Sequence, residues 1–349
     1  MSSLIKKICV CSPQIPFVRG GAEFFAENLA FRLRQLSFQV EEVRLPLQPL
    51  PLEEVVKSCL AWRLVNVDRI YNDPIDLVIG TKFPSYMVPH ARKIIWLIHQ
   101  FRQIYDFYDT PYSEVQLTSH DTELRHQLIE LDQISFGEAR KIFTISKTVS
   151  KRLKAHNGFD SIPLYPPVTD SDRFYFQSIE DFVLSVSRLE GNKRIDLLLN
   201  AMQSVPSHIK AVIVGEGFLR TQYEELAADL GISDRVHFTG EISRAEVLEY
   251  FSRAGVVFYC PVDEDYGYVT LESFYSRKPV ITCHDSGGTL EFVTPSNGWI
   301  TDPNPQAIAQ CIREAVTKKE EARAKGELGY KDISYINWQY VFDHLLSFA

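Results

Sequence analysis

The sequence predicts an α/β protein with two domains, each built around a parallel sheet. Short β-branched runs alternate with helical patterns in both halves, at the spacing of about 20–30 residues that βαβ units require. The chain has 349 residues, more than one hydrophobic core usually holds. A proline-rich segment near the middle separates the two halves.

The first domain is expected over residues 1–165. Its first strand precedes Gly20-Gly21, which opens a helix with apolar residues at a helical spacing. After the fifth strand, Ser146 is placed to cap a helix that runs through Lys154. The five expected strands are Lys7–Cys11, Gln39–Arg44, Leu77–Gly80, Lys93–Ile98 and Lys141–Ile145.

The segment Ser161–Val168 holds three prolines in five residues, which cannot continue a helix and predict a hinge. The second domain is expected over 166–336, and a C-terminal helix at about 337–349 is expected to pack back on the first domain. Two Rossmann-like domains bind ligands at the carboxyl ends of their strands, in the cleft between them. The strands expected in the second domain are Phe182–Ser187, Lys210–Val214, Arg235–Phe238, Val256–Tyr259 and Val280–Cys283.

Composition excludes several classes of protein. No run of about 18 apolar residues occurs, so no membrane-spanning helix is expected. The first residues lack a signal-peptide pattern, which favours a cytoplasmic protein. Six cysteines without a Cys-x-x-Cys pair predict buried free thiols. A net charge of −8 without a basic stripe argues against nucleic acid, whereas the less acidic first half could face an anionic acceptor or a membrane surface.

Two features close to strand ends could bind an anion. Gly20-Gly21 allows backbone N–H groups to approach a phosphate or sugar at a helix N-terminus, although it could equally be a plain tight turn. Arg188 and Lys193 follow a strand directly and suit a diphosphate, although a solvated charged loop would look the same.

Two further features are weaker. Gly215-Glu-Gly217 follows the next strand and offers another close backbone approach, but it is not a full dinucleotide-binding motif. His99 ends a strand-like run, where an imidazole could bond a sugar hydroxyl or the reacting centre. A core histidine bonded to backbone is an equal alternative.

The most informative stretch, Val262–Ser273, holds four carboxylates. Asp263 and Asp265 could form a metal motif, Glu264 and Glu272 could form an acid/base pair, or the two glutamates could hold different ends of one ligand. We expect Glu264 in a loop and Glu272 one turn inside a helix, which is not the geometry of a tight pair. The N-terminus of that helix would provide a phosphate site between the glutamates.

These motifs together resemble the retaining family-4 glycosyltransferases (glycosyl transferases group 1), which have the GT-B fold. The segment from Glu264 to Glu272 resembles that family's Glu-x7-Glu signature. The other matching elements occur in the family's order: Gly20-Gly21-Ala-Glu23, Ser187-Arg-Leu with Lys193 and Asp196, Val236-His-Phe-Thr-Gly240, and Gly287-Gly288 with Glu291.

The resemblance implies the transfer of a hexose from a nucleotide-sugar, with retention at the anomeric carbon and without a metal or other cofactor. Arg188 and Lys193 would bind the diphosphate, Glu264 the hexose hydroxyls and Glu272 the ribose. The implied roles of the other site residues are as follows: His99 contacts the hexose near the reacting carbon, Gly20 and Gly21 lie against phosphate or sugar, Gly215 and Phe238 flank the base, and the amides of Gly267, Tyr268, Val269 and Thr270 meet the distal phosphate.

Two residues depart from the family pattern, since Asp265 replaces the usual proline and Arg194 the usual glycine. UDP-glucose is the expected donor, and a glycan or lipid-linked acceptor at the inner membrane face is the expected partner. A sugar-nucleotide epimerase or hydrolase, and a catalytically silent nucleotide-sugar-binding subunit, are the alternatives. The aromatic stretch His99–Asp109 is a candidate acceptor surface, with ordinary interdomain packing as the alternative.

Overall fold

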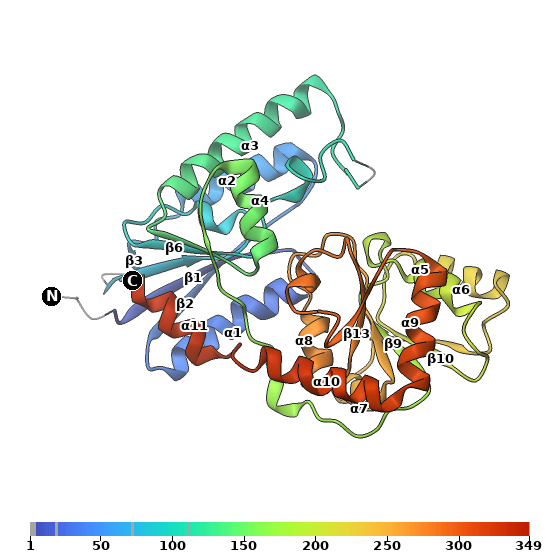
Figure 1. Ribbon diagram of the computed structural model, residues 1–349. Helices are drawn as coiled ribbons and strands as arrows, with labels where there is room; N and C mark the ends of the chain where they lie inside the picture. The colour runs from blue at the N-terminus through green and yellow to red at the C-terminus, as the bar shows by residue number, and fades with distance from the viewer. Residues whose placement is uncertain (1–4, 18–19, 71–72, 111, 349) are drawn as a thin grey trace. The chain divides into compact units, whose positions relative to one another are not determined.

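The computed structural model describes residues 5–17, 20–70, 73–110 and 112–348 (Figure 1). The chain divides into two compact units. Unit 1 comprises Met1–Thr169 and Ile336–Ala349, and unit 2 comprises Asp170–Tyr335. Within the described residues, no helix is both long enough and apolar enough to cross a membrane.

Unit 1 contains a six-stranded parallel sheet in the order β2-β1-β5-β6-β7-β8. Figure 1 shows α1 and α11 on one face of this sheet and α2, α3 and α4 on the other. The strands are β1 (Lys7–Gln14), β2 (Gln39–Pro46), β5 (Leu77–Gly80), β6 (Lys93–Leu97), β7 (Lys141–Thr144) and β8 (Ile162–Pro163), with a small antiparallel pair of β3 (Arg69–Ile70) and β4 (Asp73–Pro74). The helices are α1 (Gly21–Gln35), α2 (Leu52–Leu64), α3 (Ser119–Gly137), α4 (Lys147–Asn157) and α11 (Trp338–Leu345), with 3-10 turns η1 (Ser85–Met87), η2 (Arg102–Ile104) and η6 (Leu346–Phe348).

Unit 2 has the same plan, with a parallel sheet in the order β11-β10-β9-β12-β13-β14. Helices α5, α6 and α9 cover one face, and α7, α8 and α10 cover the other (Figure 1). The strands are β9 (Phe182–Val186), β10 (Lys210–Val214), β11 (Val236–Gly240), β12 (Val256–Phe258), β13 (Val280–Cys283) and β14 (Gly298–Thr301). The helices are α5 (Ile195–Met202), α6 (Arg220–Asp229), α7 (Arg244–Arg253), α8 (Tyr268–Tyr275), α9 (Pro305–Thr317) and α10 (Lys319–Ile333), with 3-10 turns η3 (Ser171–Arg173), η4 (Gly191–Lys193) and η5 (Gly288–Glu291).

The expected α/β class with two parallel sheets is confirmed, and each of the ten expected strands is present to within a few residues. The proline segment needs a correction, because Ile162–Pro163 pairs with β7 as the last strand of the unit-1 sheet. A proline is tolerated there because β8 lies at the edge of the sheet. The chain leaves unit 1 after Thr169.

The two ends of unit 1 pack into one core. Trp338 at the start of α11 packs edge-on against Trp96 of β6, with ring centroids 6.4 Å apart. Phe25 of α1 packs against the same indole at 4.6 Å. The C-terminal helix is therefore part of unit 1. All six cysteines are free, and all but Cys311 are buried, as expected.

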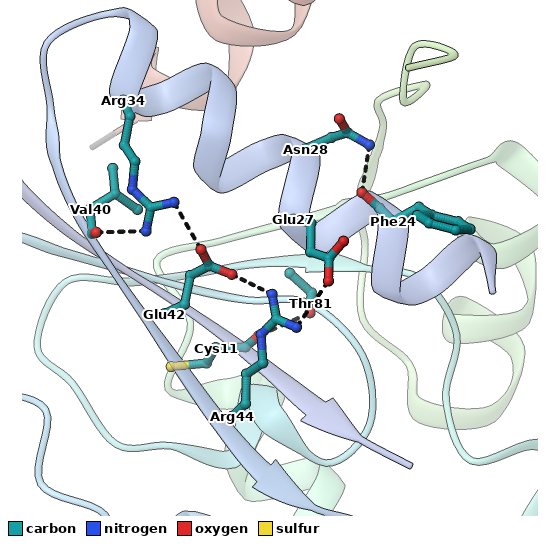
Figure 2. A network of polar contacts seen from close by, with 9 residues as sticks. All are labelled: Cys11, Phe24, Glu27, Asn28, Arg34, Val40, Glu42, Arg44 and Thr81. Carbon is teal, nitrogen blue, oxygen red and sulfur yellow. Dashed lines mark hydrogen bonds and ion pairs between the residues drawn. The ribbon is translucent and has the colours of Figure 1, made fainter. Parts of the chain in front are cut away.

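A polar network fixes α1 against β2 (Figure 2). Glu42 of β2 accepts hydrogen bonds from Arg34 of α1 at 2.9 Å and from Arg44 at 2.5 Å. Arg44 also reaches Glu27 of α1 at 3.2 Å. Networks of partly exposed ion pairs stabilise a fold only modestly, but they restrict how neighbouring elements can rotate. This network therefore orients the helix that begins at Gly20-Gly21.

Candidate functional site

Three loops of unit 2 meet at the carboxyl ends of the neighbouring strands β9, β12 and β13. We call them the 188–194, 260–267 and 284–288 loops. Backbone hydrogen bonds join them: Val262 donates to Asn192 at 2.8 Å, Asp263 to Asp285 at 2.9 Å, and Gly288 to Glu264 at 2.6 Å. Because the carboxyl ends of parallel strands are the usual ligand edge of such sheets, this is the candidate site.

A cluster of the partly buried Lys193 and Glu264 and the buried Tyr259 lies where these loops meet. Lys193 Nζ donates to Glu264 Oε2, and the Tyr259 hydroxyl donates to the same oxygen at 3.0 Å. The side chains of Lys193 and Glu264 are only 13% and 19% exposed. Burial, and then the neighbouring Glu264 carboxylate, hold the pKa of Tyr259 well above its usual range, so the phenol stays protonated as a donor. Glu264 Oε1 takes part in neither hydrogen bond.

Arg188 lies on the same edge, directly after β9, but it is far more exposed. Its side chain is 66% accessible and pairs with Glu190 at 2.8 Å. The structure therefore brings Lys193 and Glu264 together and leaves Arg188 outside their cluster.

Arg194, one of the two departures from the family pattern, adopts the left-handed conformation with φ +54° and ψ +45°. This conformation favours glycine, which accounts for the glycine usual at this place. The guanidinium pairs with Asp285 at 2.7 Å and so ties the 188–194 loop to the 284–288 loop. Arg194 therefore lacks the conformational freedom that glycine would have here, but it forms an ion pair that glycine could not.

We expect Arg194→Gly to retain nearly wild-type stability and Arg194→Ala to be less stable than Arg194→Gly by about 1 kcal/mol. Both variants lose the ion pair with Asp285, whose side chain is half exposed, so that loss is small in each. Only the alanine variant keeps a side chain at positive φ. Urea unfolding of both variants measures the difference, and equal stabilities would contradict the strain.

Gly287 and Gly288 are required by the backbone of the 260–267 loop. Gly287 has φ +60°, and a Cβ there would lie 2.6 Å from the carbonyl oxygen of Glu264. A Cβ on Gly288 would lie 2.6 Å from the carbonyl oxygen of Asp265. These two glycines therefore allow the 284–288 loop to pack directly against the backbone of the 260–267 loop, which positions Glu264.

The same reason applies to Gly215, for which the sequence suggested a close approach to ligand. At φ +128°, a Cβ on Gly215 would lie 2.0 Å from the carbonyl oxygen of Ser187. The protein backbone thus requires a glycine here, and a contact of Gly215 with a ligand stays a prediction. Phe238 of β11 is half buried and packs against the unit-2 core.

The N-terminus of α8 follows Glu264 closely. Gly267 caps it at φ +83°, and Tyr268 and Val269 are the first helical residues. The Thr270 N–H donates to the Gly267 carbonyl at 2.9 Å. The amides of Tyr268 and Val269 precede the helical hydrogen-bond ladder.

Glu272 lies in the second turn of α8 with its own cation. Arg244, the first residue of α7, contacts Glu272 at 2.8 Å and Asp170 at 2.7 Å. Burial raises the pKa of Glu272, and the charge of Arg244 opposes that rise. Glu264 and Glu272 therefore pair with different cations. Nothing in the sequence pattern marked Arg244 or Asp170, since their link to Glu272 exists only in the fold.

The unit-1 candidates lie at the carboxyl edge of the unit-1 sheet. Gly20 and Gly21 begin α1 after β1, and His99 follows β6. Gly20 has an extended backbone, and the Glu23 carboxylate accepts from its N–H at 2.9 Å. His99 Nδ1 is 2.6 Å from the carbonyl oxygen of Gln100.

Much of the candidate acceptor stretch His99–Asp109 is interior. Phe101, Ile104 and Tyr105 are buried within unit 1, and Arg102 stacks on Phe107 at 3.8 Å. Packing within the unit therefore accounts for most of its aromatic character. Among the described residues, no group of three or more His, Cys, Asp or Glu side chains is arranged to hold a metal ion.

Two Rossmann-like units with a ligand edge of this kind define the GT-B class of fold. Solved structures agree: sucrose-phosphate synthase from Thermosynechococcus elongatus superimposes with a TM-score of 0.78 at 19% identity over 98% of each chain. Anabaena HepE, solved with UDP and glucose, gives 0.71 at 14% identity over 98% of each chain.

Residues 170–332, which make up nearly all of unit 2, match the family model for glycosyl transferases group 1. An uncharacterised glycosyltransferase of Methanocaldococcus jannaschii is 33% identical over 215 residues, 55% of this chain and 54% of the relative. The GDP-mannose-dependent alpha-(1-6)-phosphatidylinositol monomannoside mannosyltransferase of Mycobacterium tuberculosis is 28% identical over 248 residues, 62% of this chain and 64% of the relative. The chain thus spans between half and two thirds of the length of these relatives.

Proposed function

We propose that this protein is a retaining glycosyltransferase that moves a hexose from a nucleoside diphosphate sugar to a glycan or lipid-linked acceptor. The observation that carries the proposal is the Lys193–Glu264–Tyr259 cluster beside the N-terminus of α8. A partly buried cation and first-turn amides suit a diphosphate. A carboxylate with one oxygen outside the cluster's hydrogen bonds suits a sugar hydroxyl.

In this proposal the residues of unit 2 stabilise the leaving group. Negative charge grows on the nucleoside diphosphate as the glycosidic bond breaks. Lys193, Arg188 and the amides of Tyr268 and Val269 provide fixed positive potential for that charge, so little reorganisation is needed in the transition state. Glu264 holds the hexose and Glu272 the ribose.

Retention is proposed to proceed by attack from the same face, with the departing phosphate accepting the proton of the acceptor hydroxyl. Glu264 is a poor covalent nucleophile, because Lys193 and Tyr259 both donate to Oε2 and reduce its electron density. Isolation of a sugar covalently attached to Glu264 would refute this route.

The roles proposed for unit 1 are positioning and acceptor binding. His99 is proposed to contact the transferred hexose, and Gly20-Gly21 to lie against its phosphate or sugar. Peripheral contact with a membrane that carries the acceptor is part of the same proposal. It is supported by the near-neutral charge of the first half of the chain.

The proposal is tested by incubating the full chain with UDP-glucose, GDP-mannose and other nucleotide-sugars, and measuring nucleoside diphosphate release. UDP-glucose is the donor we propose, and GDP-mannose is included because the Mycobacterium tuberculosis relative is named for it. We expect release with one donor to be unchanged by a chelator. Chelator-sensitive release would favour a metal at Asp263 and Asp265. Epimerised donor without release would indicate an epimerase, and binding without any turnover would indicate a silent subunit.

A further inference from the structure

A buried chain of hydrogen bonds begins at the side chain of Gln100, the residue that follows His99. The Gln100 side chain donates to Asn157 Oδ1 at 2.7 Å, and Asn157 Nδ2 donates to the Tyr105 hydroxyl at 2.9 Å. Tyr105 donates to Asp132 Oδ2 at 2.7 Å, and Tyr86 donates to Asp132 Oδ1 at 2.8 Å. We call these five residues the Asp132 network.

The Asp132 network connects several separate elements of unit 1. Asp132 lies in α3, Asn157 is the last residue of α4, and Gln100 follows β6. Tyr86 belongs to η1, and Tyr105 directly follows η2. All five side chains are buried. These hydrogen bonds therefore connect α3 to the loop after β6.

Burying the Asp132 carboxyl group in this interior costs free energy. It is fully buried, its two oxygens accept from two phenols, and burial raises its pKa to about 7. A buried acid rarely adds to stability compared with well-packed apolar residues of the same size. What the Asp132 carboxylate does in this interior is fix the positions of the Tyr105 and Tyr86 hydroxyls.

The far end of the network is Gln100, whose backbone carbonyl is 2.6 Å from His99 Nδ1. A carbonyl oxygen only accepts, so Nδ1 carries the proton in this contact. The Gln100 Oε1 atom is buried without a partner among the described residues. Asn157 is therefore the anchor that the structure shows for this side chain.

We infer that Gln100, Asn157, Tyr105 and Asp132 are positioning residues that hold His99 as its Nδ1–H tautomer. The inference rests on the proposed function only for its effect on turnover, because the tautomer itself is a property of unit 1. A histidine held in one tautomer and orientation presents the same nitrogen to every substrate molecule, and loss of such alignment reduces turnover.

The test uses Tyr105→Phe and Asn157→Leu in the full chain, with Ser135→Ala as a matched control. Ser135 is also buried in α3, but its hydroxyl bonds to its own helix at Leu131. Long-range proton–nitrogen NMR of the imidazole rings reports the tautomer, and a His99→Gln spectrum assigns the signals. We expect protonated Nδ1 in wild type and Ser135→Ala, and mixed tautomers in the two network variants.

Turnover provides the second readout. We expect kcat of the network variants to fall on the order of 10²-fold with the donor KM nearly unchanged, because the residues named for donor binding in unit 2 are intact. An unchanged tautomer in both network variants would overturn the inference. If no nucleotide-sugar is turned over by wild type but the tautomer changes as expected, the proposed function fails and the inference holds.

Discussion

Replacing Lys193 with alanine is expected to reduce turnover on the order of 10²–10³-fold, as the loss of one preorganised donor does in other active sites. Lys193 is a partly buried cation at the carboxyl edge of the unit-2 sheet, and it also neutralises Glu264. Without it, both the leaving diphosphate and the carboxylate lose their counter-charge. Arg188→Ala is expected to reduce turnover strongly as well. Steady-state nucleotide release measures both effects.

Lys210→Ala is the matched control for this prediction. Lys210 is an exposed lysine at the start of β10, at the opposite end of the strands, so its removal should leave turnover unchanged. Circular dichroism verifies that each variant is folded. A Lys193→Ala enzyme with near wild-type kcat would remove the main support for the proposed leaving-group stabilisation.

Arg244→Ala is expected to destabilise the protein by about 2–3 kcal/mol, towards the low end of the range for broken buried ion pairs. Arg244 serves two carboxylates whose side chains are little exposed, Asp170 at 18% and Glu272 at 13%. Both lose their counter-charge in the variant. The expected loss is at the low end of that range because 36% of the Arg244 side chain is exposed to screening water. Thermal unfolding at pH 7 measures the loss.

Arg253→Ala is the control, because Arg253 is equally exposed but pairs with the more exposed carboxylates of Glu180 and Glu249. We expect it to cost less than about 1 kcal/mol. Equal losses in the two variants would show that burial of the acidic partners is irrelevant.

The deficit of Arg244→Ala should also depend on pH. Burial opposes ionisation of Asp170, but the hydrogen bonds and charge of Arg244 outweigh it and hold the pKa below its usual value. That stabilisation is present above the unfolded-state pKa and is lost as pH falls through the folded one. The pKa of Glu272 is already raised in the folded protein. Ionisation of this carboxylate therefore lowers stability as pH rises, and the loss is larger when Arg244 is absent. The deficit should therefore shrink on acidification from pH 7 towards pH 4.

The repeating pattern of strands and helices was predictable because each buried parallel strand is a short β-branched run between helical segments. β14 was missed because Gly298-Trp-Ile-Thr is too short and too mixed to stand out. Its glycine is needed because a Cβ there would lie 2.5 Å from the carbonyl oxygen of Val280. β8 was missed because its proline suggests a turn, and only its edge position makes a strand possible.

The parts of the candidate site that depend on a single residue type in a local motif were predictable from the sequence. The left-handed Gly267 and the glycines behind Glu264 belong to local motifs that a sequence displays. Pairings were not predictable, because Lys193 meets Glu264 and Arg244 meets Glu272 only after distant strands come together. Gly215, which the sequence marks as a possible ligand contact, also makes room for the Ser187 backbone, and that packing was not predictable from the sequence.

The central claim is that the unit-2 edge binds a nucleoside diphosphate sugar through Lys193 and Glu264. The most direct test is the thermal shift of wild type, Lys193→Ala and Glu264→Gln with the donor sugar and with its free nucleoside diphosphate. At a hundredfold excess over Kd a ligand adds about 2.7 kcal/mol to stability. We predict that wild type is stabilised by both ligands, that Lys193→Ala loses most of both shifts, and that Glu264→Gln loses only the increment due to the sugar. Equal shifts in all three proteins, or no shift with any nucleotide-sugar, would contradict the claim.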